Sequence, residues 1–259
     1  MGFEGFIHAR RQNFYKFIKS AAGSFTINNN FIHLQACISF LMKSIFKNIQ
    51  VIELSTVLAG PAVGMFFAEL GARVTKIENK LTGGDITRQW KLPTESKSEK
   101  VSAYFASVNY GKKSLFLDFN NEKDKQKLYK LIAEADIVIS NYKKGDAEKL
   151  GMSYKDIKKI KRDIIYGHIS GYGINSKRVA YDIVLQAETG FMSMNGDERS
   201  GPLKMPVAVI DMMAAHQMKE AILIAIINRL KTGKGAYIKV SVITQARVAI
   251  IDSPSKIFW

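Results

Sequence analysis

The stretch Ile49-Gln50-Val51-Ile52-Glu53-Leu54, followed by Gly60-Pro61, decides the fold class of this 259-residue chain. Its first six residues form an apolar run of strand length. Pro61 suits the first turn of a helix, and Gly71 stands where a glycine ends one. Residues 73–78, with Val-Thr-Lys-Ile at their centre, predict the next strand. The order is therefore β-α-β, the unit from which parallel sheets are built.

The same alternation continues through the chain and predicts an α/β fold with a doubly wound, mainly parallel sheet. The fold is expected to be Rossmann-like, but no G-x-G-x-x-G follows the first strand, so a dinucleotide site is not predicted. The further expected strands are 115–118, 136–140, 164–169 and 236–242. The further expected helices are 122–134, 154–161, 181–193 and 211–231.

Residues 1–41 differ in composition from the rest of the chain, because this segment contains several basic residues and a single acid, Glu4. Such a segment is typical of a mitochondrial presequence. It is also what an upstream extension would give if Met42 were the true start. Under either interpretation we predict a basic extension outside the fold, a folded part over 42–242 and a divergent tail over 243–259.

The net charge of +15 raises the question of a polyanionic partner. The lysines and arginines are scattered, which favours solvated helix faces over a nucleic-acid stripe, and we predict no nucleic-acid partner. A phosphorylated small ligand would still benefit from the positive field. The longest apolar run, 221–227, is far shorter than the roughly 20 residues of a membrane span, so no membrane partner is predicted.

Cysteine and histidine usage argues against metal and disulfide chemistry. Cys37 is the single cysteine, which fits a reducing, cytoplasmic location, or a mitochondrial one if 1–41 is a presequence. The histidines lack metal-ligand spacing, and no metal site is predicted. No P-loop and no G-x-S-x-G motif occurs in the sequence.

A set of short motifs resembles, in order and spacing over residues 49–242, the family III coenzyme A transferases of the CaiB/BaiF type. Each motif is weak alone, and the ordered set carries the resemblance. The motifs are Val51-Ile52-Glu53-Leu54 with Leu58-Ala59-Gly60-Pro61, 69–74 with 76–78, Gly83-Gly84-Asp85 with Thr87-Arg88, Asn109 with Leu117-Asp118, 135–139 with Asn141, Leu150-Gly151, 169–173, Tyr181-Asp182, Gln186-Ala187, Thr189-Gly190, 207–211 and 232–235.

The resemblance implies that Asp211 is the nucleophile. In this frame Asp211 follows a Val-Ala-Val-Ile strand and enters a helix, a position at which α/β sheets hold ligands near helix N-terminal amides. A carboxylate there can attack a thioester to give a mixed anhydride, and then an aspartyl-coenzyme A thioester. The alternative is that Asp211 merely caps the helix 211–231.

Tyr181, 30 positions before Asp211, is the second catalytic residue that the resemblance implies. Transferases of the family have an aromatic hydroxyl there, near the thioester, whereas the related α-methylacyl-CoA racemases have histidine. A phenol is a poor base at neutral pH, so Tyr181 favours acyl-CoA transfer over racemisation. The alternative is a tyrosine that packs on the core.

The resemblance also implies contacts to coenzyme A, carried over position by position. Lys149 replaces a phosphate-binding arginine and so loses the bidentate fork, while Lys80 can compensate for Asn79, where a formyl-type transferase has arginine. The implied contacts are Leu58 and Ala59 beside the pantetheine, Leu117, Asp118 and Asn120 near the adenine, Asn141 and Tyr142 in the stretch Asn141-Tyr142-Lys143, and Lys80 and Lys149 toward the phosphates.

Taken together, the resemblance implies an acyl-CoA:carboxylate CoA-transferase, with residues 42–242 as the N-terminal part of its large domain. Coenzyme A is substrate and carrier, no cofactor is bound permanently, and the partners are an acyl-CoA and a carboxylic acid. We expect the second, smaller domain to be missing, with its glycine-rich closing loop. Family members form interlocked homodimers, which such a chain is not expected to form. The alternatives are a racemase-like enzyme and a non-catalytic, coenzyme A-binding fragment.

Overall fold

Six parallel strands form one sheet in the computed structural model, which describes residues 45–96 and 98–250. The predicted extension 1–41, with Cys37, and residues 251–259 of the predicted tail lie outside the described residues. The strand order is β3-β2-β1-β4-β5-β6. The strands are β1 (Gln50–Leu54), β2 (Arg73–Asn79), β3 (Lys113–Leu117), β4 (Ile137–Ser140), β5 (Ile165–Ser170) and β6 (Ala236–Ser241).

This order confirms the predicted doubly wound α/β fold. The chain runs outward from β1 to β3, then returns to β4, which pairs with the free side of β1. The direction of winding therefore reverses between β1 and β4. At such a switch point the loops after neighbouring strands turn apart and leave a crevice at the carboxyl edge of the sheet, where α/β proteins bind ligands.

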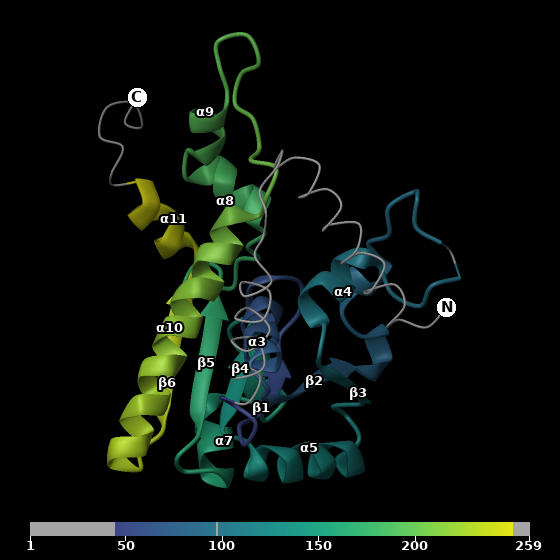
Figure 1. Cartoon of the computed structure of the whole chain (residues 1–259), viewed down its shortest axis with the longest axis vertical. Coiled ribbons are helices and arrows are strands. Elements are labelled where there is room, and N and C mark those ends of the chain that lie inside the picture. The colour runs from purple at the N-terminus through teal and green to yellow at the C-terminus, as the bar shows by residue number, and fades with distance from the viewer. Residues whose placement is uncertain (1–44, 97, 251–259) are drawn as a thin grey trace, which may run out of the picture. The chain divides into compact units, whose positions relative to one another are not determined.

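Helices cover both faces of the sheet (Figure 1). On one face, α3 and α10 pack against β1, β4 and β5, and α11 packs beside α10. On the other face lie α5 and α7. The helices are α3 (Ala59–Glu69), α4 (Ala103–Asn109), α5 (Glu122–Glu134), α6 (Asp146–Lys149), α7 (Tyr154–Ile160), α8 (Asp182–Glu188), α9 (Phe191–Asn195), α10 (Val209–Thr232) and α11 (Val242–Ile250), with short 3₁₀ helices η1 (Lys80–Thr82) and η2 (Ile86–Gln89).

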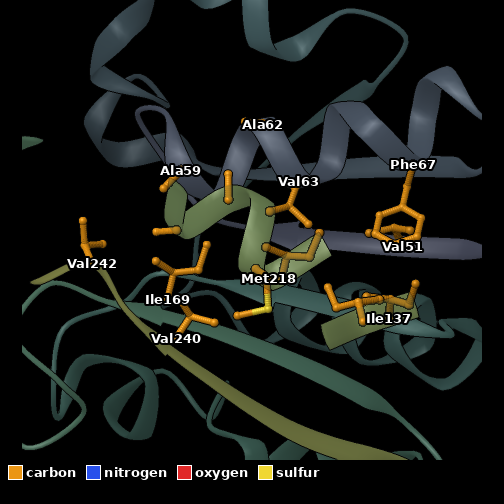
Figure 2. Packing of buried hydrophobic residues seen from close by; sticks show 14 of the residues in the cluster. Val51, Ala59, Ala62, Val63, Phe67, Ile137, Ile169, Met218, Val240 and Val242 are labelled. Atoms are coloured by element: carbon orange, nitrogen blue, oxygen red, sulfur yellow. The ribbon is translucent and has the colours of Figure 1, made fainter. Parts of the chain in front are cut away.

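The two sheet faces carry separate cores, because successive side chains of a strand point to opposite faces. In β1, Val51 joins the core under α3 and α10, whereas Ile52 joins the core under α5 and α7. Figure 2 shows Val51 and Phe67 side by side within the first core, with Met218 pointing toward the sheet. Gly167 permits this approach, since a Cβ there would lie 2.7 Å from the Met218 sulfur.

The structure differs from the sequence prediction at several places. The expected helix 181–193 is two helices, α8 and α9, because Gly190 adopts a left-handed φ of 84° between them. Three helices, α4, α6 and α11, were not predicted, and the strand expected to reach Val242 ends at Ser241. The strand expected before Asp211 is absent: residues 207 and 208 are irregular, and α10 already begins at Val209.

Candidate functional site

A cleft of about 210 Å³ lies at the carboxyl ends of β1, β4 and β5, at the switch point of the sheet. It brings together six of the residues that the sequence analysis singled out, from four separate segments. These residues are Leu58, Ala59, Asn141, Tyr142, Tyr181 and Asp211.

The β1–α3 turn forms one wall of this cleft, and Asn141 fixes it. The Asn141 side chain accepts a hydrogen bond from the Thr56 N–H at 3.1 Å and donates one to the Thr56 carbonyl at 2.9 Å. Both hydrogen-bonding ends of the Asn141 amide are therefore engaged with the protein. Asn141 lines the cleft, and its side chain joins the end of β4 to the end of β1.

Asp211 occupies the first turn of α10 and lines the cleft. It does not cap the helix. The capping carboxylate is Asp182, whose Oδ2 accepts hydrogen bonds from the N–H groups of Ile210 at 2.8 Å and Asp211 at 3.1 Å. The alternative interpretation of Asp211 as an N-cap is therefore wrong, and its own carboxylate is left for the cleft.

The environment of Asp211 favours the protonated acid. Burial, and then the negative charge of Asp182, raise the pKa of Asp211 to about 7. A carboxylic acid with this pKa is part ionised at neutral pH, and once ionised it is more basic and less solvated than an ordinary aspartate. Such tuning is frequent among catalytic carboxylates.

Asp182 is itself held by Gln186, one turn further along α8. The Gln186 amide donates to the Asp182 carboxylate and to the carbonyl of Val207 at 3.2 Å, and its oxygen accepts from the Met205 N–H at 2.8 Å. Gln186 is fully buried and Asp182 nearly so. The irregular segment that leads into α10 is thus fixed by side chains of α8, and with it the position of Asp211.

Tyr181 immediately precedes α8, and its side chain makes no cap hydrogen bond. Tyr181 is 47% exposed and lines the same cleft as Asp211. The alternative that Tyr181 packs into the core is therefore wrong. The phenol hydroxyl is available to a molecule bound in the cleft.

A second cleft, of about 250 Å³, continues along the carboxyl edge toward β2 and β3. The two clefts have Thr56, Asn141, Tyr142 and Lys143 in common, so they adjoin around the end of β4. Burial raises the pKa of Tyr142 well above that of a free phenol. An elongated ligand can lie across both clefts, with Tyr142 as a neutral hydrogen-bonding group between them.

Five of the predicted coenzyme A contacts line neither cleft. Leu117 is 1% exposed and belongs to the core under α5 and α7, so it offers no side chain to a ligand. Asp118 accepts a hydrogen bond from the Asn120 N–H at 2.8 Å and so shapes its own turn. Lys80 and Lys149, like Asn120, are exposed.

Several cleft residues escaped the sequence analysis as site residues. The cations Lys144 and Arg178 line the cleft, as does His168 on β5. Lys143, which belongs to the stretch that the resemblance implied, lines it as well. Burial lowers the pKa of His168 despite the opposing charge of Glu148. The available signal was position: residue 168 stands near the carboxyl end of an expected strand, where an α/β sheet presents side chains to ligands.

The charges of this site also affect Tyr104, which lies on the unpredicted helix α4. Burial raises its pKa, and the charges of Asp211, Asp182 and Asp85 raise it further. Its ring contacts Trp90, with centroids 5.2 Å apart. The charges of three carboxylates, from three separate segments, therefore all raise the pKa of this one phenol.

Among the residues that the structure describes, no group of three His, Cys, Asp or Glu side chains is arranged to hold a metal ion. Over the same residues, no helix combines the length and the apolar character needed to cross a bilayer.

The fold and the cleft define a doubly wound α/β protein with a cleft at its switch point and a weakly acidic carboxyl group lining that cleft. The model of CoA-transferase family III matches residues 46–253, and the chain belongs to that family. It is 34% identical over 229 residues to a protein of Fusarium pseudograminearum named acyl-CoA transferase, covering 85% of this chain and 50% of the relative.

Two further comparisons agree with this assignment. The chain is 35% identical over 195 residues to human succinyl-CoA:glutarate CoA-transferase, covering 74% of this chain and 44% of the relative. The crystal structure of a CAIB/BAIF family protein from Brucella suis superposes with a TM-score of 0.75 at 35% identity, over 81% of this chain and 56% of that one. The chain thus spans about half the length of the curated relatives it matches.

Proposed function

We propose that this chain carries the nucleophilic half of an acyl-CoA:carboxylate CoA-transferase site, with Asp211 as the nucleophile. The observation that carries the proposal is the position of Asp211: it lines the cleft with Tyr181 and the β1–α3 turn, while Asp182 performs the capping that Asp211 would otherwise do. Relatives named for transfer from succinyl-CoA to glutarate or mesaconate support the reaction class.

The proposed reaction has two symmetrical halves. The ionised Asp211 attacks the thioester carbonyl, the carbon–sulfur bond breaks, and coenzyme A leaves as thiolate, giving a mixed anhydride. The thiolate attacks the aspartyl carbonyl and releases the first acid as its carboxylate, which leaves an aspartyl-coenzyme A thioester. The second acid reverses both steps and regenerates the Asp211 carboxylate.

The cleft chemistry suits these reactants. Lys143, Lys144 and Arg178 place positive charge around a site whose ligands, coenzyme A and a carboxylate, are anions. Tyr181 offers a hydroxyl that can donate to the oxyanion formed at the thioester carbon. Because relatives are named for succinyl, glutarate and oxalate transfer, a short dicarboxylic acid is the first acceptor to test.

Trapping of the intermediate tests the proposal directly. The chain is incubated with succinyl-CoA and hydroxylamine, and the mass of the peptide that contains Asp211 is measured by mass spectrometry. An aspartyl hydroxamate at Asp211 is expected in the wild type and not in Asp211→Asn, which retains size and loses the anionic oxygen. Unmodified wild-type Asp211 in a chain that still binds coenzyme A would reject the mechanism and favour a non-catalytic, coenzyme A-binding role.

The racemase alternative has one observation in its favour, namely that His168 lines the same cleft as Asp211. Racemase chemistry would exchange the α-proton of a branched acyl-CoA with deuterated water. Exchange that needs both His168 and Asp211, without transfer of coenzyme A to a second acid, would establish it. Transfer without exchange would exclude it.

A further inference from the structure

A buried group of four charged side chains lies beneath the β1–α3 turn. Glu53, Lys76 and Asp85 are at most 1% exposed, and the Lys112 side chain is equally buried. Lys76 Nζ lies 2.9 Å from Glu53 Oε1 and 3.0 Å from Asp85 Oδ2. Lys112 Nζ lies 2.7 Å from Glu53 Oε2. Two lysines thus neutralise two carboxylates, with no net charge in the group.

Each charged residue of this group except Glu53 also makes a hydrogen bond to the backbone of the turn or of the helix that follows it. Lys76 donates to the Ser55 carbonyl at 2.6 Å, and Lys112 donates to the Pro61 carbonyl at 2.8 Å. Both carboxylate oxygens of Asp85 lie near the Val57 N–H, at 3.2 and 3.4 Å. Three contacts therefore converge on seven consecutive residues, 55–61.

The turn needs such support. Among the described residues Val57 is the one non-glycine residue with positive φ, at 70°. A β-branched residue in this region is a true outlier, and it persists only where its surroundings impose it. Thr87 in turn fixes the Asp85 carboxylate that accepts from Val57. The Thr87 N–H and hydroxyl donate to Asp85 Oδ1 at 3.1 and 2.8 Å.

A buried ion pair is weak evidence for stability, because desolvation cancels much of the attraction. A role in fixing one conformation is then the more informative interpretation. The helix above also accommodates the group: a Cβ on Gly64 would lie 1.9 Å from Glu53 Oε2, so α3 can pass over Glu53 only with glycine there.

We propose that Asp85 is a positioning residue that, supported by Lys76 and Thr87, holds the Val57 turn in the conformation that receives the acyl-CoA. The proposal rests on the proposed function, since Val57, Leu58 and Ala59 line the cleft shared with Asp211. Asp85 lies under the turn and acts through the Val57 backbone, not through contact with the reacting atoms.

Asp85→Asn in the full chain is the central variant. Its amide presents only one oxygen, so the Val57 N–H keeps one of its two acceptors, and the amide NH2 faces either Lys76, which contacts Oδ2, or Thr87, which donates to Oδ1. The side chain that holds the turn therefore loses one of its own supports in either orientation. Hydrogen exchange of residues 55–60, measured without ligand, should quicken at least about tenfold relative to the wild type. Coenzyme A affinity, measured by calorimetry, should fall about tenfold, as expected when a binding wall is no longer pre-organised.

Asp136→Asn is a matched control at the opposite end of β1. Asp136 Oδ2 accepts from the Gln50 N–H at 2.9 Å, and Asp136 Oδ1 accepts from Arg229 at 2.8 Å, so it combines a backbone contact and an ion pair as Asp85 does. This variant should quicken exchange near residue 50 and leave coenzyme A affinity within about twofold of the wild type.

Val57→Gly separates action through the turn from direct contact, because Asp85 also borders the second cleft. Glycine adopts positive φ without strain, so the effect of Asp85→Asn on affinity should shrink from about tenfold to about threefold or less in the Val57→Gly background. An undiminished effect there, or unchanged exchange at 55–60 in Asp85→Asn, would overturn the proposal. If the wild type binds no coenzyme A, the proposed function fails, and the exchange comparison alone still decides whether Asp85 holds the turn.

Discussion

The Asp182 carboxylate accepts a hydrogen bond from the backbone N–H of Asp211 at 3.1 Å. The same carboxylate raises the pKa of Asp211 through its charge, in addition to the larger effect of burial. One side chain therefore both places the proposed nucleophile and makes it a weaker acid. The two effects are separable, because an amide can keep the hydrogen bond while it removes the charge.

Asp182→Asn should lower the pKa of Asp211. The amide oxygen can still accept from the α10 amides, but the neighbouring negative charge is gone, so Asp211 ionises at lower pH. The pH midpoint of hydroxamate formation at Asp211 is the measurement, and it should move toward acid relative to the wild type. Asp182→Ala, which also removes the cap, should cost about 1 kcal/mol of stability in addition. An unmoved midpoint in Asp182→Asn would show that burial alone sets the pKa.

The relation between Asp182 and Asp211 also marks the limit of sequence-based prediction. The strands were predictable because runs such as residues 49–54 are buried on both faces of a parallel sheet. The motif order singled out Asp211, which lines the cleft, but the strand expected before it is absent. Its helix is capped from α8, 29 residues earlier in the sequence. No periodicity encodes so distant a contact.

The buried charges show the same limit. Lys76 lies in the middle of a strand and is fully buried, a position that residue type alone does not predict. Its partners Glu53 and Asp85 come from other segments, and together they outweigh the burial that disfavours the ammonium, so the pKa of Lys76 is raised. Gly190, in contrast, gave a local signal that the prediction of one helix over 181–193 did not use: a glycine weakens a helix, and here it separates α8 from α9.

Lys143 should contribute more to coenzyme A binding than Lys149 does. Lys143 lines both clefts, whereas Lys149, implied by family resemblance alone, lines neither. Lys143→Met should weaken coenzyme A binding about fivefold, the equivalent of one charge-assisted contact. Lys149→Met should change it less than about twofold. Calorimetric titrations at two salt concentrations compare them, and the reverse ranking would favour the family position over the cleft geometry.

Tyr181→Phe should slow formation of the hydroxamate at Asp211 without destabilising the chain. Tyr181 is 47% exposed and its side chain makes no cap hydrogen bond, so loss of the hydroxyl should change the free energy of unfolding by less than about 0.5 kcal/mol. Loss of a donor to the thioester oxyanion should slow acylation by about tenfold or more. Rapid-quench trapping measures the rate, and denaturant unfolding measures the stability. A wild-type acylation rate would remove Tyr181 from the mechanism.

Asp211→Asn should stabilise the chain, and only above acidic pH. Burial and Asp182 raise the pKa of Asp211 from 3.8 to about 7, so between these values the folded chain binds more protons than the unfolded chain. The free energy of unfolding therefore falls as pH rises through this window, and the loss persists above pH 7. Since the side chain is partly exposed, a loss of about 2 kcal/mol is expected in place of the full shift. Asparagine has no charge to bury, so the difference in unfolding free energy between Asp211→Asn and wild type should grow from pH 4 to pH 8.

Urea titrations across this range measure this difference, and Glu220→Gln, which changes an exposed carboxylate on the same helix, serves as the control. A difference that does not change with pH would show that Asp211 is an ordinary surface acid and would leave the cleft without its tuned nucleophile.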